Sequence, residues 1–225
     1  QELSTAVKYG LNTIALVFNN GAFGASRWDQ EHAFNGRYIG TDLHNPDFVM
    51  LAESFGATGI RTDTNGIGEA AVRGLSAEGA RVVFTGGNED AAANISADTG
   101  AVFVKHRVQD VPGWDAVEKA VRELGRLDVA FANAGVNTGD SDIETVELDA
   151  WRSIVDINLT GAMLTCKRAI AIMKDNPDQA GGSIVLNSSI NGILALADDV
   201  TYSTTKGALR LLAKSVAVHC ARKKL

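Results

Sequence analysis

The run LDVAFANAG, residues 127–135, joins an apolar segment of strand length, 127–132, to a short polar turn. Similar apolar runs recur along the chain, at residues 13–18, 57–60, 81–86, 101–105 and 182–187. Stretches with helical periodicity lie between these runs, at residues 46–55, 66–79, 112–124, 147–174 and 200–222. Parallel neighbouring strands need a crossover, which is usually a helix. The alternation therefore predicts an α/β fold, a Rossmann-like doubly wound parallel sheet with helices on both faces.

The composition sets limits on the kind of protein. A chain of 225 residues with 45% hydrophobic content suits one or two globular domains with a substantial core. A net charge of −6 argues against a nucleic-acid or anionic-membrane partner. No apolar run approaches the roughly 20 residues that a membrane span needs. Cys166 and Cys220 lie far apart without a CxxC pattern, which favours two inert thiols in a reducing cytoplasm. These features predict a cytoplasmic protein and leave a homo-oligomer open.

The segment YSTTK places Tyr202 and Lys206 four residues apart within the helical stretch 200–222. Residues four apart share one helix face, so the lysine ammonium can lie beside the phenol. A phenol has an ordinary pKa of about 10, and a nearby cation lowers it by stabilising the phenolate. Ser189, thirteen residues before Tyr202, follows the apolar run 182–187 and could hold a substrate oxygen. The pattern is typical of a site for acid–base chemistry beside a substrate oxygen.

Two further polar motifs accompany this pair: NAG, residues 133–135, and DINLTG, residues 156–161. Together with NSS (187–189) and YxxxK, in this order and spacing, they resemble the short-chain dehydrogenase/reductase family. The resemblance covers about Gly66 to Leu225 and implies a family domain truncated at both ends. It implies hydride transfer between NAD or NADP and a small alcohol or carbonyl substrate.

The resemblance also implies residue roles. Tyr202 would be the general acid/base, and Lys206 would hold the nicotinamide ribose and lower the tyrosine pKa. Ser189 would position the substrate oxygen, and Asn158 would support a proton-relay water. The cofactor cleft would be lined by Asn133, Ala134 and Gly135, in addition to Tyr202 and Lys206.

The family's phosphate loop, TGxxxGxG, is only half preserved in RTDTNGIG, residues 61–68. Its glycines let the backbone approach a pyrophosphate at a helix N-terminus. Gly66 and Gly68, with Ile67 between them, match the last two glycines and are expected to contact the cofactor. Upstream of them, Asp63 brings a carboxylate toward two phosphates. We therefore expect dinucleotide binding that is weaker than is usual in the family.

Features that distinguish NAD from NADP are also altered. The strand RVVFTGGN ends without an acidic residue for a 2′-hydroxyl, and Gly87 replaces an arginine that often binds a 2′-phosphate. Arg107 stands where the family usually has an aspartate beside the adenine. The sequence therefore leaves the choice between NAD and NADP open.

Residues 1–62 do not resemble this family. The run VFNNGAFG, 17–24, resembles the thiamine-diphosphate-binding C-terminal domain of the acetolactate synthase and benzoylformate decarboxylase group. Asn20 matches a magnesium ligand of that group, and the carbonyl of Ala22 its companion. The partner aspartate of the group's GDG motif would precede Gln1, and the activating glutamate belongs to another domain. One amide and one carbonyl cannot satisfy Mg²⁺, which needs six oxygens, so we expect no metal site and no thiamine diphosphate binding.

The chain thus resembles a chimera joined near residues 61–65, with residues 1–62 from a thiamine enzyme and 63–225 from a reductase. In the family's strand order, 57–60 would lie in the middle of the sheet, and the edge beside 182–187 would be unpaired. An unpaired edge invites a strand, so residues 13–18 are predicted to fill it. Three functions remain open: an NAD(P)-dependent oxidoreductase, a folded but inactive α/β domain, and a fragment of a thiamine-diphosphate-dependent lyase.

Overall fold

The computed structural model describes four isolated residues near the N-terminus and five continuous segments: Lys8, Asn35, Arg37, Ile39, and residues 47–54, 66–137, 142–177, 181–194 and 198–223. The chain forms two compact units, Gln1–Arg61 and Thr62–Leu225. The boundary proposed from the sequence stays a prediction. The predicted strands 13–18 and 57–60, and Asn20 with Ala22, lie outside the described residues, as does the loop 61–65.

The first unit contains helix α3, Phe48–Ser54, inside the stretch predicted as helical. Asp47 precedes this helix, and its carboxylate accepts a hydrogen bond of 3.1 Å from the backbone N–H of Met50. An aspartate at this place satisfies a backbone N–H that has no partner within the helix. The local sequence therefore determines where α3 begins.

The second unit alternates strands and helices. Its elements are, in chain order, α4 (Ile67–Ala77), β1 (Val83–Gly86), α5 (Glu89–Thr99), β2 (Val102–Lys105), α6 (Trp114–Glu123), β3 (Val129–Ala132), α7 (Leu148–Val155), a π-helical turn (Asp156–Thr160), α8 (Gly161–Met173), β4 (Ser183–Leu186), a 3₁₀ turn (Ile190–Gly192) and α9 (Val200–Lys223).

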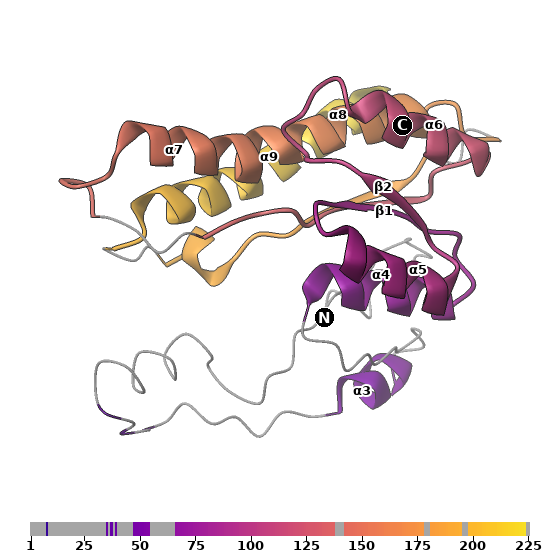
Figure 1. Cartoon of the computed structure of the whole chain (residues 1–225), viewed down its shortest axis with the longest axis horizontal. Helices are drawn as coiled ribbons and strands as arrows, with labels where there is room; N and C mark the ends of the chain where they lie inside the picture. The colour runs from indigo at the N-terminus through magenta and orange to yellow at the C-terminus, as the bar shows by residue number, and fades with distance from the viewer. Residues whose placement is uncertain are drawn as a thin grey trace. The chain divides into compact units, whose positions relative to one another are not determined.

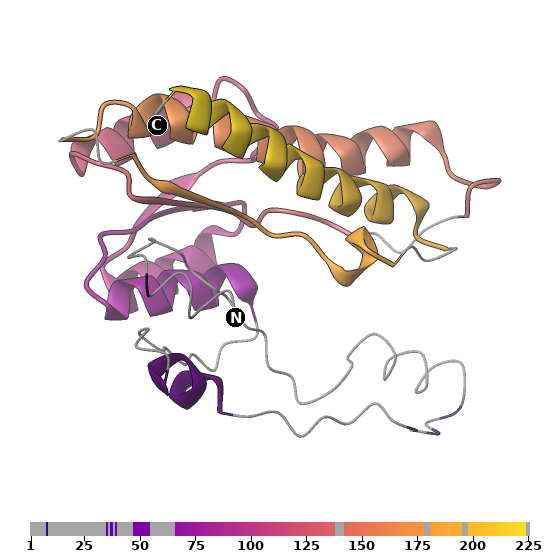
Figure 2. The same cartoon turned by 180° about the vertical axis from the view of Figure 1, so that it is seen from behind.

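The strands pair in parallel, as the alternation predicts. Val83 of β1 lies opposite Val102 of β2, and Val129 of β3 lies opposite Ser183 of β4. Figures 1 and 2 show α4 and α5 on one face of the strands and α6, α8 and α9 on the other. The predicted α/β fold with helices on both faces of parallel strands is confirmed. Among the described residues, β4 has a strand neighbour on one side only.

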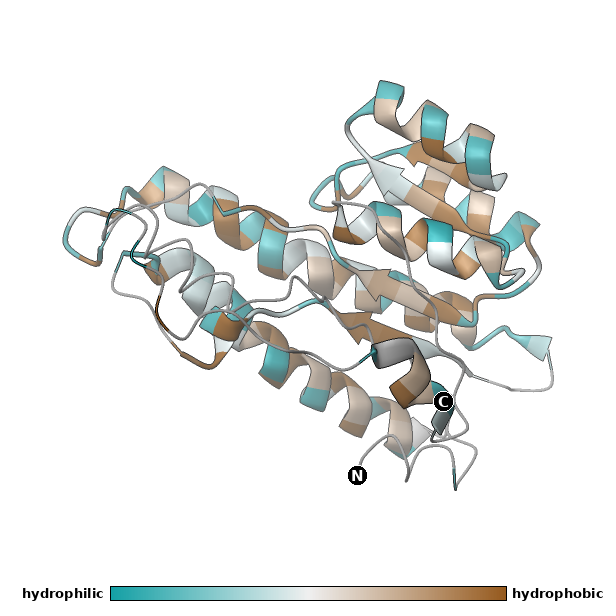
Figure 3. Cartoon of the chain, turned by 90° about the horizontal axis from the view of Figure 1, so that it is seen from below, coloured by the Kyte–Doolittle hydropathy of each residue, from teal (hydrophilic) through white to brown (hydrophobic). Residues whose placement is uncertain are grey.

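Hydrophobic side chains fill the space between these layers. The strands are largely brown in Figure 3, the colour of hydrophobic residues. One cluster joins α4 and α5 to β1, another joins α6 and α8 to β2, and a third joins α8 and α9 to β3 and β4. Their buried members are, respectively, Val72, Ile95 and Ala101; Trp114, Val117 and Leu164; and Ala132, Ala162 and Leu209. Part of the apolar surface of the strands is therefore shielded from water by the helices, which stabilises the layered arrangement.

Helix α5 was not predicted from hydrophobic periodicity. Its sequence EDAAANISADT is rich in alanine and polar residues, and it buries only Ala92 and Ile95. The residues at the two ends of α5 indicate the helix in the sequence. The Asn88 side chain accepts a hydrogen bond from the backbone N–H of Ala91, and Gly100 ends the helix with φ 72°. Asparagine and glycine are preferred at these two positions, so capping residues identify a helix that periodicity misses.

The two ends of the β3–β4 pair are each held by an asparagine. At their start, the buried Asn176 side chain accepts from the backbone N–H of Leu127 at 2.9 Å and donates to the Leu127 carbonyl at 2.7 Å. It also donates to the Gly181 carbonyl at 2.6 Å. The opposite end of the pair carries the candidate site.

No helix in the described part of the chain has both the length and the apolar character to span a membrane.

His106 follows β2 directly and is buried, with 5% of its surface exposed. Its ring meets the Trp114 ring edge-on at 4.7 Å between centroids, and neither ring nitrogen has a hydrogen-bond partner among the described residues. Desolvation lowers the pKa of His106, against an opposing attraction from Asp110. The folded chain therefore holds this imidazole neutral below the pH at which an unfolded histidine takes up a proton.

Replacement of this buried imidazole should make folding less sensitive to acid. Between the lowered folded pKa and the ordinary value of about 6.5, the unfolded state binds more protons, so stability falls as pH falls through this window. His106→Phe should flatten the decline in unfolding free energy between about pH 6.5 and 5. Urea titration at several pH values measures it. His219→Phe, at an exposed position of α9, should keep the wild-type slope; equal slopes for both variants would contradict the assignment.

Candidate functional site at the carboxyl ends of β3 and β4

Two asparagines mark the point where β3 and β4 end. Asn133 follows β3 and Asn187 follows β4, and the Asn187 side-chain amide donates to the Asn133 side-chain carbonyl at 2.9 Å. The first turn of α4 also approaches this point, because a Cβ on Gly68 would lie 3.1 Å from Nδ2 of Asn133. Carboxyl ends of parallel strands, with a helix N-terminus beside them, form the usual ligand-binding edge of such a sheet.

Lys206 is the buried cation of this edge. It lies on α9 with only 3% of its surface exposed, and its Nζ donates to the backbone carbonyl of Asn187 at 2.8 Å. The same Nζ is 5.4 Å from the centroid of the Tyr202 ring. Burial lowers the pKa of Lys206. The helix spacing thus brings the half-buried phenol and the ammonium together, as the sequence predicts.

Asn158 connects three segments through its side chain. Its Oδ1 accepts from the backbone N–H of Val136 at 2.8 Å, and its Nδ2 donates to the Val136 carbonyl at 2.9 Å and to the Thr205 hydroxyl at 3.2 Å. Asn158 is completely buried within the π-helical turn, where Gly161 N–H donates to the Asp156 carbonyl five residues earlier. π-turns inside helices are frequent at functional sites. The stretch 147–174, predicted as one helix, therefore contains a π-turn, and this turn carries Asn158.

Gly135 lies in close contact with both buried groups. A Cβ at this position would lie 3.3 Å from Oδ1 of Asn158 and 3.3 Å from Nζ of Lys206. Gly135 and its neighbour Ala134 are themselves exposed. The NAG turn therefore lies over Asn158 and Lys206 and presents an open backbone surface that a ligand can reach.

Ser189 precedes the 3₁₀ turn, and its Oγ accepts from the backbone N–H of Asn191 at 3.2 Å. The adjacent Ser188 hydroxyl donates to the backbone carbonyl of Lys206 at 2.7 Å. A Cβ on Gly192 would lie 2.7 Å from that same carbonyl oxygen. The NSS segment is thus packed directly against the part of α9 that carries Lys206.

The loop glycines are not all brought into this cluster. Gly66 is the N-cap residue of α4 in an extended conformation, and its nearest neighbour for a Cβ is Glu69 of the same helix, at 3.7 Å. Ile67 is 37% exposed. Gly68 alone of the three touches the asparagine pair.

The structure adds residues that the motifs did not single out. Asn187 belongs to the NSS motif, and its backbone carbonyl accepts a hydrogen bond from Lys206. Thr205 belongs to the YSTTK motif, and its hydroxyl accepts a hydrogen bond from Asn158. Neither contact could be read from the motifs. Asp199 is buried with 6% exposure, and its carboxylate accepts a hydrogen bond from the Asn191 side-chain amide. Thr205 carries a usable signal, because a threonine on the same helix face as an apolar stripe needs a polar partner. The hydrogen bonds from Asn137 and Asn191 to Asp199 join positions 62 and 8 residues apart, and neither separation is a helix or turn spacing that would mark the contact in the sequence.

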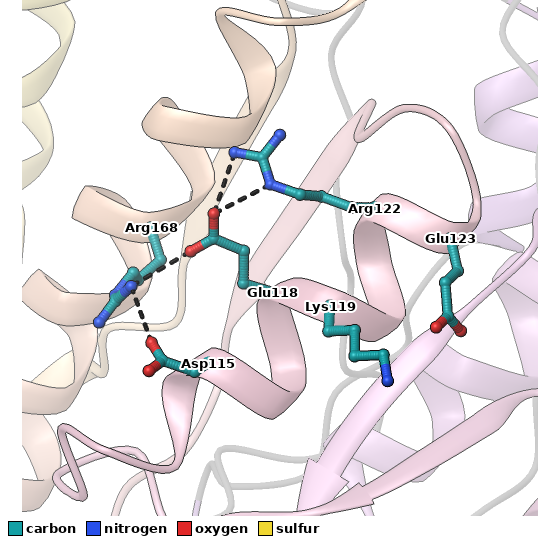
Figure 4. A pocket seen from close by; sticks show the side chains of 6 residues that line it. All are labelled: Asp115, Glu118, Lys119, Arg122, Glu123 and Arg168. Carbon is teal, nitrogen blue, oxygen red and sulfur yellow. Dashed lines mark hydrogen bonds and ion pairs between the residues drawn. The ribbon is translucent and has the colours of Figure 1, made fainter.

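A separate pocket between α6 and α8 is lined by charged side chains, most of which pair with one another. Figure 4 shows Arg168 directed at Asp115 and Glu118, while Lys119 and Glu123 point away from it. Arg168 pairs with Glu118 at 3.1 Å, and Arg122 pairs with the same carboxylate at 2.9 Å. These opposite charges satisfy one another and join the two helices, so we do not assign a ligand to this pocket.

Comparisons with known proteins identify the family of the chain. The family model "short chain dehydrogenase" matches residues 59–225, most of the chain. The chain therefore belongs to the short-chain dehydrogenase family. A second model, "Thiamine pyrophosphate enzyme, C-terminal TPP binding domain", matches residues 1–84. The two-part origin that the sequence predicts is supported, and the two matches overlap at residues 59–84.

Three of the similar proteins are named as dehydrogenases. A 3-beta-hydroxysteroid dehydrogenase of Comamonas testosteroni is 34% identical over 69% of this chain and 61% of its own length. An NADP-dependent (R)-specific alcohol dehydrogenase of Lentilactobacillus kefiri is 32% identical over 71% and 64%. A trans-4-hydroxycyclohexanecarboxylate dehydrogenase of Sinomonas cyclohexanicum is 37% identical over 68% and 62%. The chain thus spans about three fifths of the length of these relatives.

The buried ammonium should leave a pH signature on folding. Because burial lowers the folded pKa of Lys206, the unfolded state binds more protons between that pKa and the ordinary value of about 10.4, and stability rises with pH across this window. Lys206→Met removes this dependence, so its stability relative to wild type should be highest near pH 7 and decline toward pH 10. Chemical denaturation at stepped pH measures the difference. Lys214→Met, at an exposed position of α9, should show no such trend.

A constant difference between Lys206→Met and wild type over this pH range would contradict a desolvated ammonium at this site. The comparison across pH is independent of the packing change that the substitution introduces, because that change contributes equally at every pH. The measurement therefore isolates the charge.

Proposed function

We propose that the family domain of this chain is an NAD(P)-dependent oxidoreductase that interconverts an alcohol and a carbonyl compound. The observation that carries the proposal is the Lys206 ammonium, buried on the Asn187 carbonyl at 2.8 Å and 5.4 Å from the Tyr202 ring centroid. A cation beside a phenol favours the phenolate, which is the form that accepts a proton from an alcohol. Tyr202 is the proposed acid/base.

Lys206 has a second proposed role. An ammonium carries three N–H donors, and one of them is used by the Asn187 carbonyl. The remaining donors lie under the exposed Gly135 backbone, where hydroxyl groups of a ribose could accept them. Asn158 keeps that backbone in place through Val136. Its proposed part in a proton relay rests on this position beside Thr205 and Lys206.

The residues present fit a nicotinamide dinucleotide. Gly68 leaves open a space next to Asn133 that a Cβ would fill. Gly135 leaves open a similar space next to Lys206. Helix α4 begins at Ile67, and the N–H groups of its first turn, which cannot bond within the helix, suit a diphosphate. The cofactor supplies or accepts the hydride. NAD and NADP both belong to the proposal, because the residues after β1 do not distinguish them.

The proposed substrate is a secondary alcohol or ketone with an apolar ring or chain. Ser189 would hold its oxygen, because the hydroxyl accepts from Asn191 and keeps its own hydrogen for donation. The residues that follow Ser189 present exposed apolar side chains: Ile190 at 55%, Ile193 at 62% and Leu194 at 62%. The named substrates of two relatives, a hydroxysteroid and a hydroxycyclohexanecarboxylate, are alicyclic alcohols.

The N-terminal part is proposed to have no thiamine chemistry. Its match to a thiamine pyrophosphate enzyme covers only that enzyme's C-terminal binding domain. Within it, Asn20 and Ala22 offer Mg²⁺ one amide and one carbonyl, which are too few oxygens. Titration with thiamine diphosphate and Mg²⁺, followed by thermal shift, should show no stabilisation.

The proposal also includes a cytoplasmic location for the protein.

The acid/base role is tested at Tyr202. With NADH or NADPH and a panel of alicyclic ketones, Tyr202→Phe should lower kcat by about 10²- to 10⁴-fold, because proton transfer is lost. Cofactor affinity, measured by nicotinamide fluorescence, should change little. Lys206→Ala should weaken both quantities, because one cation serves both steps. Thr204→Ala, at an exposed position of α9 two residues after Tyr202, is the matched control.

Two results would count against this proposal. Wild-type chain that binds neither cofactor and turns over no ketone would contradict the activity and favour a folded, inactive domain. Turnover that survives in Tyr202→Phe would contradict the assigned role of Tyr202.

The half-preserved phosphate loop gives a further test. Combined Arg61→Thr, Thr62→Gly and Asp63→Gly should tighten NADH binding about tenfold, or roughly 1.4 kcal/mol, because the change removes a carboxylate and restores the glycine that permits close approach. Fluorescence titration measures the gain. Asp149→Asn removes a surface charge from α7 and should leave affinity unchanged. No gain in the triple variant would show that the loop does not limit binding.

A further inference from the structure

We propose that Asp199 is a positioning residue that fixes the Ser189 hydroxyl through Asn191. The inference deepens the proposed function, because it assigns a support for the group that would hold the substrate oxygen. It begins from a buried charge that the proposed chemistry does not use. Asp199 is 6% exposed and lies directly before α9.

The Asp199 carboxylate connects the segments that carry the site. Its Oδ2 accepts from the Asn191 side-chain amide at 2.7 Å and from the Asn137 side-chain amide at 3.3 Å. Asn137 follows the NAG turn, Asn191 lies in the 3₁₀ turn after Ser189, and Asp199 leads into the helix of Tyr202. One carboxylate therefore fastens the ends of β3 and β4 to the start of α9.

The bond to Asn191 has a directional consequence at Ser189. The backbone N–H of Asn191 donates to Ser189 Oγ at 3.2 Å. A hydroxyl that accepts a hydrogen bond from a fixed donor directs its own hydrogen elsewhere. With Asn191 held at its side chain by Asp199, the Ser189 hydrogen remains available to a substrate oxygen. The charge-assisted bond at 2.7 Å is the stronger of the two that Asp199 accepts.

The turn has little freedom to move in another direction. Gly192 approaches the Lys206 carbonyl so closely that a Cβ would lie 2.7 Å from its oxygen, and the Ser188 hydroxyl donates to that same oxygen. The turn is thus fixed on one side by α9 and on the other by Asp199. If the carboxylate is removed, Asn191 loses its side-chain anchor while the contact to α9 persists.

An aspartate before a helix could simply be an N-cap, so the substitutions must separate capping from positioning. Asparagine and serine cap helices about as well as aspartate. Asp199→Asn and Asp199→Ser therefore preserve the cap and remove the charged acceptor. Asp198→Asn, at the exposed neighbouring position, is the matched control.

The kinetic test uses the full chain with NADPH or NADH and the alicyclic ketone that wild type reduces fastest. Asp199→Asn should lower kcat about tenfold or more, with cofactor affinity unchanged, because a misplaced positioning group affects the reaction step. In a Ser189→Ala background the same substitution should have an effect below about twofold, since the two residues act as one unit. Asp198→Asn should behave as wild type in both backgrounds. Equal losses from Asp199→Asn with and without Ser189 would overturn the proposal, as would an unchanged kcat.

A second measurement needs no turnover. Amide hydrogen exchange of residues 188–194 should accelerate at least tenfold in Asp199→Asn and remain unchanged in Asp198→Asn, because the Asn191 N–H loses its support. Unchanged exchange would overturn the proposed connection even in an active enzyme. Wild type that reduces no ketone, with accelerated exchange in the variant, would support this contact and contradict the proposed function alone.

Discussion

The buried ammonium of Lys206 is the constraint on which the site depends. A charge taken out of water destabilises the fold unless hydrogen bonds compensate it. Here the Asn187 carbonyl accepts one N–H, and this requires β4 to end beside the first turns of α9. A side chain at position 135 would crowd this group, because a Cβ there would lie 3.3 Å from the ammonium nitrogen. Three segments distant in sequence are thus positioned around one nitrogen atom.

The π-helical turn has a similar origin. Asn158 is fully buried, and its side chain satisfies both backbone groups of Val136 as well as the Thr205 hydroxyl. The π-turn differs from a regular α-helix by its wider backbone bond, from the Gly161 N–H to the Asp156 carbonyl, and Asn158 lies within it. The turn at Asp156–Thr160 accepts a less favourable backbone bond and keeps the amide aligned with the NAG turn. Local helix geometry therefore yields to the need to satisfy buried polar groups.

Local spacing explains what the sequence could predict. The strands follow from apolar runs, and the Tyr202–Lys206 contact follows from a four-residue separation on one helix. The contacts of Asn158 and Asp199 reach across 22 and 62 residues, so they depend on how the layers pack. Helix α5 was missed because its apolar face is narrow, although its caps at Asn88 and Gly100 mark both ends.

Most residues of the proposed site lie in the part of the chain that matches only the dehydrogenase model. The two family matches overlap only at residues 59–84, so Asn158, Ser189, Tyr202 and Lys206 all lie in the part that matches the dehydrogenase model alone. Gly68, by contrast, lies in the overlap, where the diphosphate would be held. The hydrogen bonds around Asn158 and Lys206 lie within the residues that the structure describes. The half-preserved phosphate loop, residues 61–68, lies at the proposed join. The proposed acid–base groups therefore do not depend on where the two parts join, whereas the proposed diphosphate site does.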